Sequence, residues 1–234
     1  MMGIAGVVFC GDIEAMDWTQ QIDGYCERLS PTLWAEPVNA VTNLAFIIAA
    51  VIMWRRAGGV PSARVLAGIL MLIGIGSFLF HTHATVWAAL MDVVPIAVFV
   101  LTYLYLVNRW VLETGRAVAI VLTALFVPFA AIVTLGVSEV PFLRVSGSYW
   151  AVPLALVIYG MGLRRRYPDL VRGFWIGAAI LVLSICLRSL DMAVCPGFPV
   201  GTHFAWHVLN GVMLGWMIHV WVKFVKARRL AGLG

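Results

Sequence analysis

Charged residues are scarce in this sequence of 234 residues: they make up 12% of it, whereas hydrophobic residues make up 62%. Soluble domains carry about 25% charged residues, so the composition excludes an ordinary soluble domain. Uncharged stretches long enough to cross a bilayer recur along almost the whole chain. The sequence therefore predicts an all-α membrane protein that crosses the bilayer several times and has no room for a separate soluble domain.

Lysine is nearly absent, since only Lys223 and Lys226 occur and both follow the last apolar segment. A retinal protein would need a lysine midway along its last helix, so a light-driven pump or receptor of that kind is excluded. A convincing secretory signal is also missing, because residues 1–10 are apolar but short, uncharged and followed by acids. Met16 is a plausible alternative start, and the residues before it carry no functional prediction.

Seven apolar segments predict a bundle of seven transmembrane helices. They lie at about residues 38–54, 65–80, 86–107, 117–135, 149–163, 173–190 and 203–221. Around them we expect an extramembrane N-terminal segment at residues 1–37, a helical domain at 38–222 and a basic tail at 223–234.

The basic residues predict how this bundle lies in the membrane. All but Arg28, Arg144 and Arg188 of the 16 basic residues fall in the first, third and fifth connections or in the C-terminal tail. By the positive-inside rule, the C-terminus is cytoplasmic and the N-terminus is outside. The net charge of +5 is therefore a signal of topology and does not indicate a nucleic-acid partner. We expect a bacterial inner membrane, with the outer end of the bundle facing the periplasm or exterior.

The histidines gather at this outer end. Five occur in the chain, and all except His219 fall in the outer layer. His203 and His207 open the last helix four residues apart, which places both rings on one face. In an apolar helix each imidazole needs a partner, and a transition metal is a frequent one. The alternative is that each ring simply hydrogen-bonds a neighbouring helix.

Other polar residues are predicted at the same membrane depth. Ser77 and His81 share a face of the second helix, and Asp92 lies about two turns into the third. Three imidazoles with an open fourth position are typical of catalytic zinc, which activates water. A carboxylate can then move a proton, and a hydroxyl can donate to an oxyanion. Singly, Ser77 could bond its own helix, Asp92 could pair with Arg188, and His81 could mark the membrane surface.

The order and spacing of these residues resemble the alkaline ceramidases. Their motifs correspond here to SxxxH from Ser77 to His81, an aspartate at Asp92, and HxxxH from His203 to His207. The stretch WAEPVNAVTNLAF, residues 34–46, is similar to the entry of that family's first helix. The family belongs to a superfamily of seven-helix membrane hydrolases that includes the progestin and adipoQ receptors. The resemblance covers the chain from about Asp23 to the end of the last helix.

This resemblance implies a membrane-embedded zinc amidohydrolase that cleaves the N-acyl bond of ceramide to a sphingoid base and a fatty acid. It implies that His81, His203 and His207 bind zinc. Asp92 would act as general base and acid, and Ser77 would support the oxyanion. The expected partners are a lipid substrate and the membrane, with no nucleic acid and no obligate protein partner.

Three alternatives stay open on the sequence alone. The first is a related zinc hydrolase that acts on another lipid amide or ester. The second is a seven-helix lipid receptor in which the same histidines hold a structural zinc. The third is a haem-binding electron carrier, which would use histidines on facing helices but would not need Ser77 or Asp92. Pocket shape decides lipid choice, and a sequence does not display it.

Eukaryotic members of the resembled family have a calcium site before the first helix. The matching carboxylates here are Asp23, Glu27 and Glu36, and carboxylate oxygens suit calcium. The sequence departs from that pattern at Leu29, where another oxygen ligand is expected. A solvated acidic loop would have the same composition.

Two cysteines are predicted on the oxidising side of the membrane, Cys26 in the N-terminal segment and Cys195 in the loop before the last helix. We predict that they form a disulfide, and the resemblance implies the same bridge. Cys186 is expected to be a reduced packing residue within the sixth helix. Arg188 and Asp191, three residues apart near the outer end of that helix, could form an ion pair.

Overall fold

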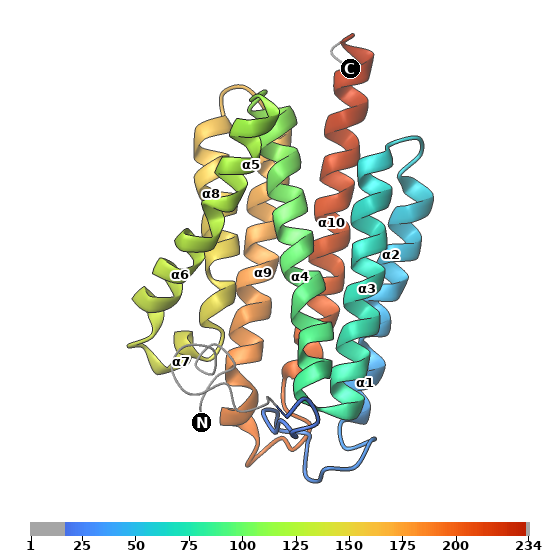
Figure 1. Ribbon diagram of the computed structural model, residues 1–234, viewed down its shortest axis with the longest axis vertical. Helices are drawn as coiled ribbons and strands as arrows, with labels where there is room; N and C mark the ends of the chain where they lie inside the picture. The colour runs from blue at the N-terminus through green and yellow to red at the C-terminus, as the bar shows by residue number, and fades with distance from the viewer. Residues whose placement is uncertain (1–16, 233–234) are drawn as a thin grey trace.

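The computed structural model describes residues 17–232 and shows a bundle of long, nearly parallel helices (Figure 1). Residues 1–16, which contain Cys10 and the alternative start at Met16, lie outside the described part. The helices are α1 (Pro37–Thr42), α2 (Leu44–Arg56), α3 (Pro61–His83), α4 (Val86–Leu106), η2 (Val107–Val111), α5 (Arg116–Ala124), α6 (Phe126–Val137), α7 (Pro141–Arg144), η3 (Gly147–Tyr149), α8 (Ala151–Leu163), α9 (Pro168–Val194) and α10 (His203–Leu230). The prediction of an all-α membrane protein is confirmed.

Six helical stretches in the described part are long and apolar enough to cross a bilayer. They are Pro37–Arg56, Pro61–His83, Val86–Val111, Arg116–Val137, Pro168–Val194 and His203–Leu230. The predicted fifth span corresponds to the shorter helix Gly147–Leu163. The count of seven spans and the orientation of the termini therefore stay predictions.

Several helices begin where local chemistry favours a start. Proline occupies the first turn of α1, α3 and α9, where its missing N–H would have no partner in any case. α10 runs to Leu230, so residues 223–230 of the predicted basic tail continue the helix. The polar end of α10 thus extends well past its apolar part.

The N-terminal segment is tied to the turn between α3 and α4. α3 ends at His83, and the next residue, Ala84, has a left-handed backbone (φ 47°). The Ala84 carbonyl accepts a hydrogen bond from the backbone N–H of Ile22 at 2.7 Å, and Gln20 accepts one from Val86 at 3.1 Å. These bonds hold the segment across the end of the bundle where α3 stops and α4 begins.

Candidate metal centre

Three imidazoles from two helices meet inside this end of the bundle. His81 lies in the last turn of α3, and His203 and His207 lie in the first two turns of α10. All three are buried, and a ligand nitrogen from each lies within 4.8 Å of the others. The structure thus brings together the three histidines that the sequence predicted as metal ligands. His83 packs against Trp87 with ring centroids 5.1 Å apart and is not in this group.

The remaining ring nitrogens of two of these histidines are held by polar neighbours. His81 Nδ1 lies 2.6 Å from Glu36 Oε2, and this carboxylate oxygen accepts a hydrogen bond from the ring N–H. His207 Nδ1 lies 2.9 Å from Thr42 Oγ1. The Thr42 hydroxyl has its own acceptor at the Val38 carbonyl, so its oxygen is free to accept from His207. Both imidazoles therefore carry their proton on Nδ1.

This assignment leaves two lone pairs facing each other. The Nε2 atoms of His81 and His207 are 3.0 Å apart, and neither carries a proton in the tautomers assigned above. Two facing lone pairs repel unless a cation or a proton lies between them. His203 Nδ1 is buried and has no hydrogen-bond partner. The three residues thus fit a metal ion that prefers imidazole ligands.

Tyr25 covers the third imidazole. Its ring stacks on that of His203, with centroids 3.8 Å apart and an interplanar angle of 23°. Burial raises the pKa of the Tyr25 phenol, which keeps the group neutral. Tyr25 thus packs against a candidate metal ligand.

Ser77 and Asp92 meet beside the imidazoles. Ser77 is buried one turn before His81 on α3, and its side chain lies beside the carboxylate of Asp92 on α4. The two helices come close here because Gly76 has no Cβ. A Cβ at this position would collide with the backbone carbonyl of Met91. The pairing of predicted catalytic side chains is therefore built into the contact between α3 and α4.

Arg188 directs its hydrogen bonds to residues other than the two aspartates considered as partners from the sequence. Its guanidinium donates to the Val145 carbonyl, the Ser146 hydroxyl and the Tyr25 hydroxyl. Asp191, the partner considered on its own helix, has different contacts. The structure thus does not form the ion pair between Arg188 and Asp191.

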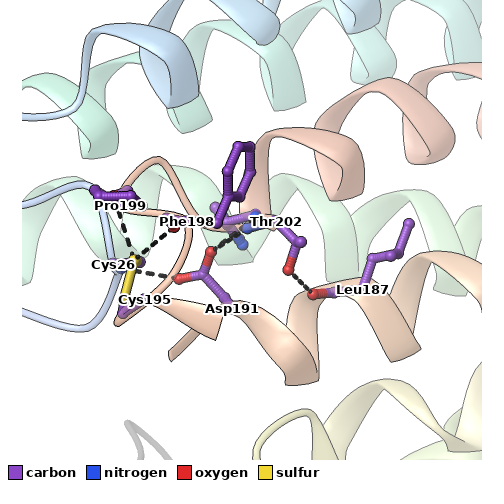
Figure 2. Close-up of a disulfide and its surroundings, with 8 residues drawn as sticks. Cys26, Leu187, Asp191, Cys195, Phe198, Pro199 and Thr202 are labelled. Atoms are coloured by element: carbon purple, nitrogen blue, oxygen red, sulfur yellow. Dashed lines mark hydrogen bonds between the residues drawn. A yellow bond between two sulfur atoms is a disulfide. The ribbon is translucent and has the colours of Figure 1, made fainter. Parts of the chain in front are cut away.

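Asp191 instead holds the start of α10. Its Oδ1 accepts from the backbone N–H groups of Thr202 at 2.7 Å and His203 at 2.8 Å, and its Oδ2 accepts from Cys26 at 2.9 Å. Figure 2 shows this carboxylate beside the disulfide between Cys26 and Cys195. The disulfide was predicted, and Cys186 is a free cysteine as expected.

The carboxylates expected to bind calcium do not form a metal site together. Asp23 is exposed, and Glu27 accepts from the backbone N–H groups of Val38 and Asn39 at the start of α1. Glu36 is buried between Arg28 and His81. Within residues 17–232, the three histidines are the only cluster of at least three such side chains with ligand atoms close enough to share one ion. Glu27 and Glu36 thus have other partners in this structure, and the calcium site stays a prediction.

An apolar cavity lies inside the bundle, and several residues of its wall are neighbours of His207. Trp206 and Asn210, which flank His207 on α10, contribute to its wall, and so does Phe46. The Phe46 ring lies 6.1 Å from the His207 ring, centroid to centroid. Deeper in the bundle, side chains of α3, α4, α8, α9 and α10 form most of the rest, among them Ile73, Phe99, Leu156, Leu181 and Met213. Such a lining suits a hydrocarbon chain.

Comparison with known families places this site in context. No curated protein matches the sequence. The model of the family described as Ceramidase matches residues 19–231, which is nearly the whole chain and includes every residue of the candidate centre. The family implies a hydrolase with a lipid substrate and membrane association. The chain therefore belongs to the Ceramidase family.

Proposed function

We propose that this protein is a zinc-dependent amidohydrolase that cleaves the N-acyl bond of ceramide, giving a sphingoid base and a fatty acid. The family supports hydrolysis of ceramide. One structural observation carries the zinc proposal. The unprotonated Nε2 atoms of His81 and His207 face each other at 3.0 Å, with His203 beside them.

His81, His203 and His207 would hold the zinc ion. Three neutral nitrogen ligands leave one position open, as in catalytic zinc sites. When bound, zinc would act as a Lewis acid and make water a better nucleophile at neutral pH. Glu36 and Thr42 would keep the ligand rings oriented through their Nδ1 atoms.

The polar pair beside the histidines would move the protons of hydrolysis. Asp92 would accept a proton from the attacking water and deliver it to the nitrogen of the departing amine as the C–N bond breaks. In the structure the Ser77 side chain lies beside this carboxylate. Once Asp92 has taken up the proton, the Ser77 hydroxyl can turn toward the carbonyl oxygen and stabilise its developing charge.

The apolar cavity supports a lipid as the substrate. Phe46 and Trp206 in its wall are neighbours of His207, so a hydrocarbon chain inside the cavity would place an adjoining amide near the imidazoles. The polar headgroup would then remain at the outer end, near the N-terminal segment. Burial of the chain supplies affinity in proportion to its apolar surface.

The proposed orientation places this centre on the outer side of a bacterial inner membrane. The histidines lie at the end of the bundle opposite the C-terminus (Figure 1). The basic residues Arg55, Arg56 and Lys223 lie at the ends of α2 and α10 that are far from the histidines. Such a charge distribution favours a cytoplasmic C-terminus.

The proposal is tested by hydrolysis of a fluorescent ceramide and by zinc analysis of the purified protein in detergent. Wild type is compared with His207→Ala and with His219→Ala, which alters a half-buried histidine of the same helix away from the centre. We expect about one zinc per chain in wild type and in His219→Ala, and loss of zinc and activity in His207→Ala.

Other results would point elsewhere. Zinc without ceramide hydrolysis would move the substrate to another lipid amide or ester, or the protein to a receptor role. Wild type that binds no zinc, under conditions that do not strip metal, would contradict the proposal.

A further inference from the structure

A buried guanidinium lies behind one of the candidate metal ligands. Arg28 is 6% exposed, although it belongs to the N-terminal segment outside the bundle. Its Nε donates to Glu36 Oε1 at 2.5 Å, and its Nη2 donates to the backbone carbonyl of His81 at 3.3 Å. Its Nη1 donates to the carbonyls of Ser30 at 3.3 Å and Thr32 at 3.4 Å.

This charge has a partner and a full set of acceptors. A buried cation is costly unless it is paired and hydrogen-bonded. Arg28 has one carboxylate and three carbonyl oxygens around it, and the planar fork of a guanidinium can contact all of them at once. The arrangement therefore suits a planar cation at its centre.

Arg28 reaches His81 by two routes. Through Glu36, whose two carboxylate oxygens divide between Arg28 Nε and His81 Nδ1, it sets the position of the imidazole ring. Through the His81 carbonyl it sets the end of α3.

The chain around Arg28 is itself anchored. Two residues earlier, Cys26 forms the disulfide with Cys195 and donates its backbone N–H to Asp191. The same Asp191 holds the first N–H of α10 at His203. The segment that carries Arg28 thus contacts both helices that supply the imidazoles.

We propose that Arg28 is a positioning residue for the metal centre. It is a built-in cation that fixes Glu36 and the end of α3, so that His81 Nε2 points at His203 and His207. With the guanidinium in this place, the N-terminal segment needs no calcium ion to hold the centre together. The inference rests on the proposed zinc centre but not on the substrate.

A purely structural salt bridge would give a different result from a positioning residue. Loss of a structural bridge lowers the melting temperature but leaves the zinc affinity of the folded protein unchanged. Loss of a positioning residue weakens zinc binding, as substitutions behind metal ligands typically do by about 10- to 100-fold. It also changes the ligand field, which the visible absorption spectrum of the Co²⁺-substituted protein reports.

The experiment compares wild type, Arg28→Gln, Arg28→Lys and a control, Arg144→Gln, which removes an exposed arginine at the end of α7. Zinc affinity is measured by competition with a chelator, and the Co²⁺ spectrum is recorded for each. We expect about 10- to 100-fold weaker zinc binding and an altered Co²⁺ spectrum in Arg28→Gln, and wild-type values in Arg144→Gln. Wild-type zinc affinity in a folded Arg28→Gln variant would overturn the inference.

A second variant covers the case in which Arg28→Gln does not fold. Lysine keeps the charge but cannot bond Glu36 and the His81 carbonyl together, so Arg28→Lys should bind zinc less tightly than wild type. Unchanged affinity in that variant would also overturn the inference.

Calcium gives an independent measurement. Millimolar Ca²⁺ should leave the melting temperature and zinc affinity of calcium-free wild type unchanged. An increase in either would contradict the inference that Arg28 serves as the cation of this segment. These outcomes are separable from failure of the proposed function. Wild type that binds zinc in an Arg28-dependent way but leaves ceramide intact would refute only the substrate.

Discussion

The Oδ1 atom of Asp191 lies 2.8 Å from the backbone nitrogen of His203, so a carboxylate on α9 caps the helix that carries two of the three imidazoles. The first N–H groups of a helix have no partner within it, and negative charge is favourable there. Because Asp191 also accepts from Cys26, one side chain aligns α10 with the segment that carries Arg28.

Removal of this carboxylate should loosen the metal centre. Asp191→Ala would leave the N–H groups of Thr202, His203 and Cys26 without their acceptor, at a cost of about 1–3 kcal/mol for a buried unsatisfied group. We expect a lower melting temperature and weaker zinc binding. Asp169→Asn, at an exposed position in the first turn of α9, is the control and should match wild type. Equal stability of Asp191→Ala and wild type would show that the cap is unimportant.

Gly201 makes this contact possible. Its backbone is left-handed (φ 68°), and a Cβ would collide with Asp191 Oδ1 and the Cβ of Cys26. Gly201→Ala should therefore cost at least the roughly 1–2 kcal/mol of a left-handed L-residue, and should displace the start of α10. Gly197→Ala in the same loop is a matched control, because a Cβ there meets no atom within 4 Å. Thermal unfolding and zinc affinity measure both effects, and indistinguishable alanine variants would contradict the argument.

The residues on helices could be predicted from the sequence, whereas their supports could not. His203 and His207, and likewise Ser77 and His81, show the four-residue spacing of one helix face, and the charge pattern put them at one depth. Glu36, Arg28 and Asp191 have no such periodicity, because their contacts depend on how the N-terminal segment and the loop before α10 fold back. A loop contact of this kind leaves no local sequence signal.

The ends of the helices were also difficult to predict from the sequence. Hydropathy marks the part of a helix that lies in lipid, not the point where its hydrogen bonds stop. α10 therefore continues through Lys223 and Arg229 to Leu230, where the sequence predicted a tail. α8 shows the other side of this difference. With η3 it forms the helix Gly147–Leu163, which covers the predicted span at residues 149–163 but is shorter than the six stretches that can cross a bilayer.

Far from the metal centre, Glu113 should make stability depend on pH. It accepts from Arg166 at 2.6 Å and Arg228 at 2.8 Å, and these hydrogen bonds hold the pKa of the Glu113 carboxyl below its ordinary 4.5. A lowered pKa stabilises the folded state above pH 4.5, and this contribution disappears as the pH falls through the folded-state pKa.

Glu113→Gln should therefore melt slightly below wild type at neutral pH, and the two should converge in acid. The effect is small because the pair is exposed. The check is a series of melting temperatures from neutral pH to below 4.5, with Glu139→Gln, an exposed glutamate beside Ser138, as the control. A difference between Glu113→Gln and wild type that stays constant across the series would rule out the linkage.

Substitutions at Ser77 and Asp92 should separate the effects on catalysis from the effects on metal binding. Neither side chain belongs to the group of three histidines, so Asp92→Asn and Ser77→Ala should keep the zinc of wild type. If Asp92 moves the proton, Asp92→Asn should lower kcat by about 10²- to 10⁴-fold. If Ser77 stabilises the oxyanion, Ser77→Ala should lower kcat by about 10²- to 10³-fold. Ser138→Ala, at a half-buried position away from the centre, is the control. Loss of zinc in either variant would instead assign the pair to the architecture of the centre, and unchanged kcat would remove both residues from the chemistry.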